Sequence, residues 1–224
     1  MSDVDPRVIA IDGSSGSGKS TVSRTVAEAL GVEVLDTGAM YRAVTLAVLE
    51  AGVAPDDELA CEGVARAVSI AVERGVTKLD ERDVSAKIRG PAVTSAVSAV
   101  SAHPALRRIL VDQQREWIEA HGGGVVEGRD IGTVVFPHAA VKVFLVADDA
   151  ERARRRQRDE QAASRDVALE SVQESLARRD ALDSARVVSP LRAAEDAVVI
   201  DTTTRGVDDI AAEIVARFRH AQES

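Results

Sequence analysis

The segment from Gly13 to Ser20, "GSSGSGKS", matches the phosphate-binding pattern G-x-x-x-x-G-K-[ST]. It lies between an apolar run, "RVIAIDG", and a helical pattern that stops at Gly31. Glycines let backbone N–H groups turn toward phosphate oxygens, and the following helix adds the positive end of its dipole. Lys19 would then act in catalysis by bridging the β- and γ-phosphates, and Ser20 would bind Mg²⁺. The predicted ATP-binding residues are Gly13, Ser14, Ser15, Gly16, Ser17, Gly18, Lys19, Ser20 and Thr21.

Several classes of protein use such a loop, so the loop alone does not identify a reaction. The guanine-recognition motif N-K-x-D of GTPases is absent from the sequence, and so is the signature of ABC transporters. The chain has 224 residues, which suits one domain with small insertions. These observations favour a kinase that phosphorylates a small acceptor.

Arginines are concentrated in the run "ERARRRQR", which begins at Glu151. Helical spacing puts Arg152, Arg155 and Arg156 on one face. Like charges on one face repel each other unless an anion or an acidic partner compensates. A charge run is most often solvated surface, but a phosphoryl-transfer enzyme needs such groups to stabilise its transition state. Both interpretations stay open at this point.

Further arginines occur in short polar segments: Arg42, Arg129, Arg179 and Arg186. Arg129 follows a buried strand, at the edge of the sheet where doubly wound folds bind ligands, which favours a functional role for it. The adjacent Asp130 could pair with an arginine or accept a hydrogen bond from an amino group. The four histidines show no convergent pattern, so histidine catalysis and histidine metal sites have little support.

Composition excludes several classes of function. The net charge of −9 argues against general affinity for nucleic acid or an anionic membrane, and 2% aromatic residues leave no stacking platform for RNA. Cys61 is the only cysteine, which excludes an internal disulfide, and its helical spacing with apolar neighbours predicts a core position. The N-terminus lacks the order of a signal peptide, and no run approaches the ~20 apolar residues of a membrane span. We therefore expect a cytoplasmic protein.

The hydrophobic pattern predicts an α/β fold with a five-stranded parallel sheet flanked by helices. The expected strands are "RVIAIDG", "VEVLD", "GGGVVEG", "AVKVFLVA" and "DAVVIDTT". Helices are expected after the phosphate loop, at about 40–51, on both sides of a break at His103–Pro104, through the arginine run, at "VALESVQESLARRDALD" and at 207–220. In the stretch of about 68–90, apolar residues alternate with small or polar ones, unlike the continuous apolar runs of the parallel strands. Its segments "VTKL" and "DVSAKIRG", with a turn at Arg74–Gly75, predict a small antiparallel insertion.

Five segments, taken together, resemble bacterial cytidylate kinases, nucleoside monophosphate kinases of the P-loop class that phosphorylate CMP and dCMP. They are "IAIDGSSGSGKST", "LDTGAMYRAV", "EGRDIGTVVFPHAAVKVFLVA", "ERARRRQ" and "SARVVSPLRAAEDAVVIDTT". The segments keep the order of the family and extend over nearly the whole chain. The resemblance implies a single three-layer P-loop kinase unit, residues 1–224. Its parts would be a core at about 1–38, 104–150 and 187–224, monophosphate-binding helices and insert at about 39–103, and a helical lid with its adjoining helix at about 151–186.

The resemblance also implies roles for individual residues. The CMP-binding residues would be Thr37, Tyr41, Arg42, Ser98, Arg107, Arg129, Asp130, Arg179, Asp183 and Arg186. Arg42, Arg129 and Arg186 match phosphate-binding arginines, while Ser98, Arg107 and Asp130 match the residues that recognise cytosine. Asp183, close to Arg179, matches a carboxylate near the sugar. Arg152 and Arg156 of the lid would approach the transferred phosphate, so the catalytic set would be Lys19, Arg129, Arg152, Arg156 and Arg186.

Two positions depart from the family pattern: Thr37 replaces a more familiar serine, and Glu127 replaces a frequent aspartate. A carboxylate is expected near Mg²⁺, and the sequence does not choose between Asp36 and Glu127. Two alternatives stay open. One is a kinase of the same architecture with UMP, AMP or shikimate as acceptor, and the other is a nucleotide-binding scaffold that no longer turns over. Without a heptad pattern or a large apolar stripe, a monomer is the default expectation.

Overall fold

The computed structural model describes residues 5–162, 164–165, 167–186 and 188–223. Several sequence expectations extend outside these ranges, among them the parts expected at about 1–38, 151–186 and 187–224. The expectation that the N-terminus lacks a signal peptide includes residues 1–4, and the last segment of the family resemblance includes Val187.

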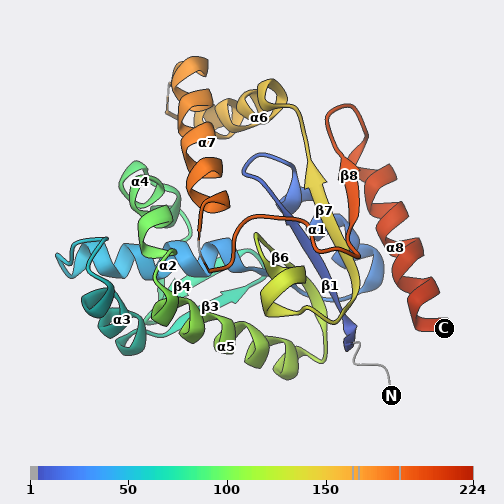
Figure 1. Cartoon of the computed structure of the whole chain (residues 1–224), viewed down its shortest axis with the longest axis horizontal. Helices are drawn as coiled ribbons and strands as arrows, with labels where there is room; N and C mark the ends of the chain where they lie inside the picture. Colours follow the sequence, from blue (N-terminus) through green and yellow to red (C-terminus); the bar gives the residue numbers. More distant parts are fainter. Residues whose placement is uncertain (1–4, 163, 166, 187, 224) are drawn as a thin grey trace.

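The main sheet has five strands, all paired in parallel, in the order β2-β6-β1-β7-β8. The strands are β1 (Asp5–Gly13), β2 (Val34–Asp36), β6 (Gly124–Gly128), β7 (Ala139–Val146) and β8 (Val198–Asp201). Figure 1 shows β1 and β7 at the centre of the sheet. The five-stranded parallel sheet predicted from the sequence is confirmed.

Helices cover both faces of this sheet, which gives three layers (Figure 1). Along β1, Val8 and Ala10 face one layer and belong to a core shared with α2 (Thr37–Glu50) and α5 (Pro104–His121). Ile9 and Ile11 face the opposite layer and belong to a core shared with α1 (Lys19–Leu30) and α8 (Val207–Glu223). A strand buried on both faces is typically a near-continuous apolar run, as residues 8–11 are in the sequence.

Capping residues determine where the helices around the sheet begin and end. Asp36 caps α2, because its side chain accepts a hydrogen bond from the Ala39 backbone N–H at 2.9 Å. This cap starts a helix that carries Thr37, Tyr41 and Arg42 directly from the end of β2. The helix before β2, α1, ends at Gly31, whose left-handed φ of 68° suits glycine.

The predicted antiparallel insertion is confirmed, with one correction. It comprises β3 (Ile70–Glu73), β4 (Val76–Leu79) and β5 (Arg82–Asp83), and is flanked by α3 (Glu58–Ala67) and α4 (Pro91–Val100). The expectation that "DVSAKIRG" is a strand was wrong beyond Asp83. The chain instead forms a turn, followed by a short 3₁₀ helix, η1 (Lys87–Arg89). Val84, just before the turn, and Ile88, in the 3₁₀ helix, are both buried, four residues apart.

Two helices stand above the carboxyl edge of the sheet, α6 (Asp149–Ala162) and α7 (Leu169–Ser184) (Figure 1). They pack on each other through a small apolar cluster that includes Ala153, Val172 and Leu176. The arginine run is therefore helical, as the sequence predicted.

One element had no counterpart in the sequence prediction. A single π-helical turn, η2 (Ile131–Val135), follows β6 and the residues Arg129 and Asp130. Cys61 is fully buried, as its spacing predicted. Among the described residues, no helix combines the length and the apolar character that crossing a membrane requires.

Candidate active site

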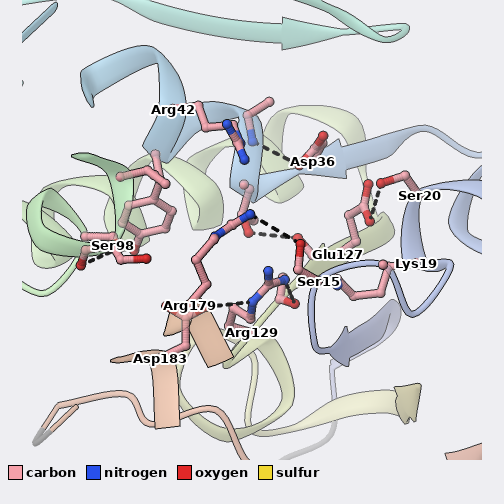
Figure 2. A pocket seen from close by; sticks show the side chains of 18 of the residues that line it. Ser15, Lys19, Ser20, Asp36, Arg42, Ser98, Glu127, Arg129, Arg179 and Asp183 are labelled. Atoms are coloured by element: carbon pink, nitrogen blue, oxygen red, sulfur yellow. Dashed lines mark hydrogen bonds and ion pairs between the residues drawn. The ribbon is translucent and has the colours of Figure 1, made fainter. Parts of the chain in front are cut away.

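A cleft lies at the carboxyl edge of the sheet, between the P-loop, α2, α4, α5, the end of β6, and the paired helices α6 and α7. In Figure 2, Lys19 and Ser20 lie on one side of the view and Ser98 on the other, with Arg42, Arg129 and Arg179 between them. Parallel sheets bind ligands at this edge. The cleft is therefore the candidate active site.

The P-loop places backbone close to its neighbours, which only glycine allows. A Cβ on Gly13 would lie 2.3 Å from the Leu145 carbonyl oxygen, and one on Gly16 would lie 2.9 Å from that of Arg152. Both glycines also have positive φ, 149° and 79°. Ser17 is fully buried, and its hydroxyl donates to the Ser14 carbonyl oxygen at 3.0 Å. The short distance from Gly16 to Arg152 means that the loop and the beginning of α6 are in direct contact.

Lys19 is held inside this loop. Its Nζ donates to the carbonyl oxygens of Gly13, at 2.8 Å, and Ser14, at 2.7 Å. Burial lowers the pKa of Lys19, and the nearby positive charge of Arg129 lowers it further. A bound polyphosphate would reverse this effect, because a negative charge stabilises the ammonium form.

Ser20 and Glu127 face each other, and the Ser20 hydroxyl donates to Oε2 of Glu127 at 3.0 Å (Figure 2). Burial raises the pKa of Glu127, and the charge of Asp36, its neighbour in the sheet register, raises it further. A hydroxyl and carboxylates are hard oxygen donors, which suit Mg²⁺. Within the described ranges there is no group of three or more His, Cys, Asp or Glu side chains placed to hold a metal. A magnesium ion here would therefore share its coordination with phosphate oxygens and water.

Arg42 and Arg179 line the cleft, and neither makes an ion pair with a carboxylate among the described residues. Arg42 donates to the Ile88 carbonyl oxygen and to the Thr94 hydroxyl, both at 3.0 Å, and Arg179 donates to the Ser15 hydroxyl at 3.3 Å. Burial, followed by the charge of neighbouring arginines, lowers the pKa of Arg42 to about 9 and that of Arg179 to about 10. Two half-buried cations that make no ion pair with a carboxylate in the described part of the chain form a site for an anion.

Arg129 and Arg186 share one carboxylate. Nε of Arg129 lies 3.1 Å from Oδ2 of Asp183, and Nη2 of Arg186 lies 2.5 Å from Oδ1. Arg186 also donates to the Ser101 hydroxyl at 2.7 Å. Asp183 is 3% exposed, so the two guanidinium groups are fixed by a buried anchor at the edge of the cleft.

A second buried ion pair joins Arg107 of α5 to Asp130, which follows β6, with 2.5 Å between Nη2 and Oδ2. The Arg107 guanidinium lies 5.0 Å from the centre of the Tyr41 ring and donates to the Ser101 carbonyl oxygen at 3.1 Å. Ser98 lines the same end of the cleft. The hydrogen-bond donors of Arg107 and the acceptor oxygens of Asp130 therefore lie side by side in a buried polar pocket.

Arg152, which the family resemblance places near the transferred phosphate, is not among the residues that line the cleft. It contacts the Ser15 carbonyl oxygen at 3.1 Å, Asp149 at 2.5 Å, and Asp180 of α7. Its side chain is 8% exposed. These contacts attach α6 to the P-loop and to α7.

Arg156 does line the cleft, and it pairs with Glu160 at 2.5 Å. Arg155 lines it too, paired with Glu151 at 3.1 Å and donating to the hydroxyl of Thr202 at 2.9 Å. Arg155 and Arg156 therefore have acidic partners, which compensate part of the repulsion expected between like charges on one helical face.

Sequence reasoning omitted several polar residues of the cleft from its candidates. They are Arg89, Ser101, Arg155, Arg158 and Asp159. Arg155 was already predicted on the same helical face as Arg152 and Arg156, so the helical spacing contained a usable signal. Arg89 and Ser101 had none, because their positions depend on how η1 and α4 pack against α2.

The cleft brings together all ten predicted acceptor-site residues. From the predicted ATP-binding segment it includes Ser15, Gly16, Gly18, Lys19, Ser20 and Thr21. The other candidates, Gly13, Ser14, Ser17 and Arg152, are not among the residues that line the cleft. These placements agree with a donor site joined to an acceptor site.

The family model described as cytidylate kinase matches residues 9–220. The chain belongs to the cytidylate kinase family. It is 54% identical over 200 residues to a cytidylate kinase of Mycolicibacterium paratuberculosis, covering 88% of each chain. It is 48% identical over 218 residues to a cytidylate kinase of Nocardia farcinica, covering 96% of this chain and 94% of the other.

The fold also resembles a solved structure of an uncharacterized protein from Eubacterium ventriosum. The TM-score is 0.55 at 14% sequence identity, and the match covers 96% of this chain and 99% of that one. At this identity the likeness concerns the fold alone. The matches to cytidylate kinases, by contrast, span both the P-loop and the arginine-rich end of the cleft.

Proposed function

We propose that this member of the cytidylate kinase family transfers the γ-phosphoryl group of Mg·ATP to CMP or dCMP. The products would be ADP and CDP or dCDP. Membership of the family supports this activity. The observation that carries it is one continuous cleft, which contains Lys19 of the P-loop together with the Arg107–Asp130 pair. A donor triphosphate and an acceptor nucleotide both fit the chemistry of its two ends.

The arginines of the cleft would bind the acceptor phosphate. Arg42 and Arg179 make no ion pair with a carboxylate in the described part of the chain, so a phosphate dianion would compensate both. Arg129 and Arg186, anchored on Asp183, would bind the same phosphate from another side. Asp183 would also lie close to the sugar, as the family resemblance implies.

The Arg107–Asp130 pair would recognise cytosine. Arg107 engages Oδ2 of Asp130, which leaves Oδ1 to accept a hydrogen bond from the cytosine amino group. Arg107 would donate to the ring N3 or the carbonyl oxygen, and Ser98 would assist. Uracil reverses the donor pattern at N3 and at position 4, so it would leave buried groups unpaired, at a cost of roughly 1–3 kcal/mol.

Transfer itself requires no protein nucleophile. An oxygen of the acceptor phosphate attacks the γ-phosphorus in line, the bond from that phosphorus to the β,γ-bridging oxygen breaks, and ADP leaves with the electron pair. Lys19 and Arg156 would neutralise charge that develops on the phosphoryl oxygens. The contacts of Arg152 favour a different role from the one the sequence suggested, which is to hold α6 against Ser15.

Ser20 would hold Mg²⁺, with Glu127 binding through water; Asp36 is the neighbouring alternative. The bond between Ser20 and Glu127 supports Glu127 as the closer carboxylate. Bound Mg²⁺ would supply positive charge between the β- and γ-phosphates.

The three parts expected from the sequence fit this scheme. Core segments 1–38, 104–150 and 187–224 would carry the donor site, 39–103 the monophosphate site, and 151–186 a helical lid. Closure of the lid would exclude water and limit hydrolysis of ATP. We further propose that the protein acts as a monomer in the cytoplasm, where its proposed substrates are metabolised.

Measuring ADP formation with Mg·ATP and each of CMP, dCMP, UMP, AMP and shikimate tests this function, with Lys19→Ala as the control. Rapid turnover with CMP and dCMP, lost in the control, is expected. Faster turnover with another acceptor would overturn the assignment of the base-binding residues. ATP binding without turnover on any acceptor would instead identify a nucleotide-binding scaffold.

A further inference from the structure

Asp12 is a buried carboxylate that the reaction scheme leaves without a role. It is the residue before Gly13, at the end of the central strand β1, and its side chain is 4% exposed. In the sheet it stands opposite Gly128 of β6 and Phe144 of β7. It therefore lies between the donor loop, which follows it, and the segment that leaves β6.

Both carboxylate oxygens of Asp12 accept backbone hydrogen bonds from that segment. The Ile131 N–H donates to Oδ1 and the Gly132 N–H donates to Oδ2, each at 2.8 Å. A buried carboxylate is costly unless such bonds compensate it, and here each oxygen has one. Ile131 and Gly132 directly follow Arg129 and Asp130, which contact the acceptor in the proposed function.

The same turn is fixed from its other side. The carbonyl oxygen of Asp130 accepts from Val134 N–H at 2.9 Å, and a Cβ on Gly132 would lie only 3.1 Å from Cγ and Cδ of Lys142. The turn is thus packed against β7 while Asp12 binds its first two N–H groups. Because the tie is bidentate, it restrains both the position and the rotation of the backbone next to Asp130.

We propose that Asp12 is a positioning residue for phosphoryl transfer, which ties the strand of the P-loop to the turn that carries Arg129 and Asp130. This inference rests on the proposed function. The tie sets the separation between the donor loop and the acceptor groups, and in-line transfer depends on that separation. Asp12 itself touches neither substrate.

The substitution Asp12→Asn tests this role with almost no change in volume. Asparagine offers one acceptor oxygen, and its amino group would face a backbone N–H, so only one of the two bonds can persist. We expect kcat with CMP to fall by about tenfold to a hundredfold, because a misplacement of about 1 Å by a mutation away from the chemistry costs up to roughly a hundredfold. The KM for CMP should rise. The KM for ATP should change by less than about twofold, since the backbone of the P-loop binds the phosphates.

A matched variant separates positioning from loss of stability. Ile214→Val removes one methylene from a fully buried position where α8 packs on the other face of the sheet. It should shift the melting temperature and leave kcat and both KM values unchanged. If Asp12→Asn also changes only the melting temperature, Asp12 is merely structural and the proposal is wrong.

Amide hydrogen exchange at Ile131 and Gly132 gives a readout that does not depend on activity, and in the wild type it needs no variant at all. Both amides should be protected in the wild-type protein, and protection should fall in Asp12→Asn while the amides of α8 keep theirs. Exchange in the wild type as fast as in an exposed turn would overturn the proposal. A wild-type protein that is inactive on CMP but keeps this protection would contradict the proposed function and leave the tie between β1 and the turn supported.

Discussion

The Arg107 guanidinium and the Asp130 carboxylate form an ion pair with 2.5 Å between Nη2 and Oδ2, and both side chains are at least 95% buried. A buried pair of this kind contributes little net stability, because desolvation offsets most of its attraction. The pair lies at the end of the cleft opposite the P-loop, so its importance is for binding rather than for stability. It presents an acceptor and several donors in a fixed arrangement, which is what selection between cytosine and uracil requires.

Asp130→Asn should lower kcat/KM for CMP by about tenfold to a hundredfold, which corresponds to roughly 1–3 kcal/mol for a hydrogen bond lost in a buried site. The amide can donate where the carboxylate accepted, so UMP should lose less activity than CMP. Steady-state kinetics with both nucleotides measure the ratio. Equal losses on the two acceptors would mean that Asp130 does not read the base.

Arg179→Met should stabilise the protein without ligand and impair catalysis. Burial is the largest effect that lowers the pKa of Arg179, and the charge of Arg129 is the next, so removing this half-buried cation relieves both its desolvation and its repulsion from Arg129. We expect the melting temperature to rise by roughly 2–4 °C, the shift that about 1 kcal/mol produces in a chain of this size. Both kcat and the affinity for CMP should fall. Scanning calorimetry with and without CMP checks the melting temperature and the affinity, and steady-state kinetics measure kcat. A destabilised variant would show that the repulsion is already compensated.

Glu127→Gln should raise the Mg²⁺ concentration that gives half-maximal activity by several-fold, because the amide loses the charge that attracts the cation. The KM for CMP should stay unchanged. Asp36→Asn is the matched comparison, since Asp36 is the neighbouring carboxylate. A larger shift in Asp36→Asn would assign the role to Asp36, and removing Mg²⁺ with a chelator should abolish activity in all three proteins.

The stability of the protein should depend on pH through Asp12. Burial raises the pKa of Asp12 from 3.8 to about 6, so the folded state binds a proton more tightly than the unfolded state does. The contribution of Asp12 is therefore greatest at low pH and is lost as the pH rises from about 4 to about 6.

Over that range the free energy of unfolding of the wild type, minus that of Asp12→Asn, should fall by up to about 3 kcal/mol. Other carboxylates titrate in both proteins and cancel in this difference. Denaturant titrations at several pH values measure it. A difference that does not change with pH would contradict the raised pKa.

The sequence was sufficient for the parts of the site that depend on local backbone geometry. The P-loop pattern requires glycine at positions such as Gly13 and Gly16, where the structure leaves no space for a Cβ, so local spacing predicts the loop correctly. Apolar runs likewise located the five strands, because a strand covered on both faces is largely apolar. Helical spacing correctly put Arg152, Arg155 and Arg156 on one face.

Spacing could not determine which partner each side chain takes. Arg152 and Arg155 are less than one helical turn apart, yet Arg152 contacts Ser15 and Asp180 while Arg155 reaches Thr202. These choices depend on the packing of α7 and on the loop after β8, which are distant in the sequence. The turn η2 was missed for a related reason. It is held by Asp12, more than a hundred residues earlier, and no local pattern records that contact.

Simultaneous quantification of ADP and CDP with Mg·ATP and CMP tests the central claim most directly, because it distinguishes transfer to the nucleotide from hydrolysis. The wild-type protein should form the two products in equal amounts, and Lys19→Ala should form neither at a comparable rate. With UMP in place of CMP, much less nucleoside diphosphate should appear. Formation of ADP without CDP, or faster transfer to UMP or AMP than to CMP, would contradict the assignment of this cleft as a (d)CMP kinase site.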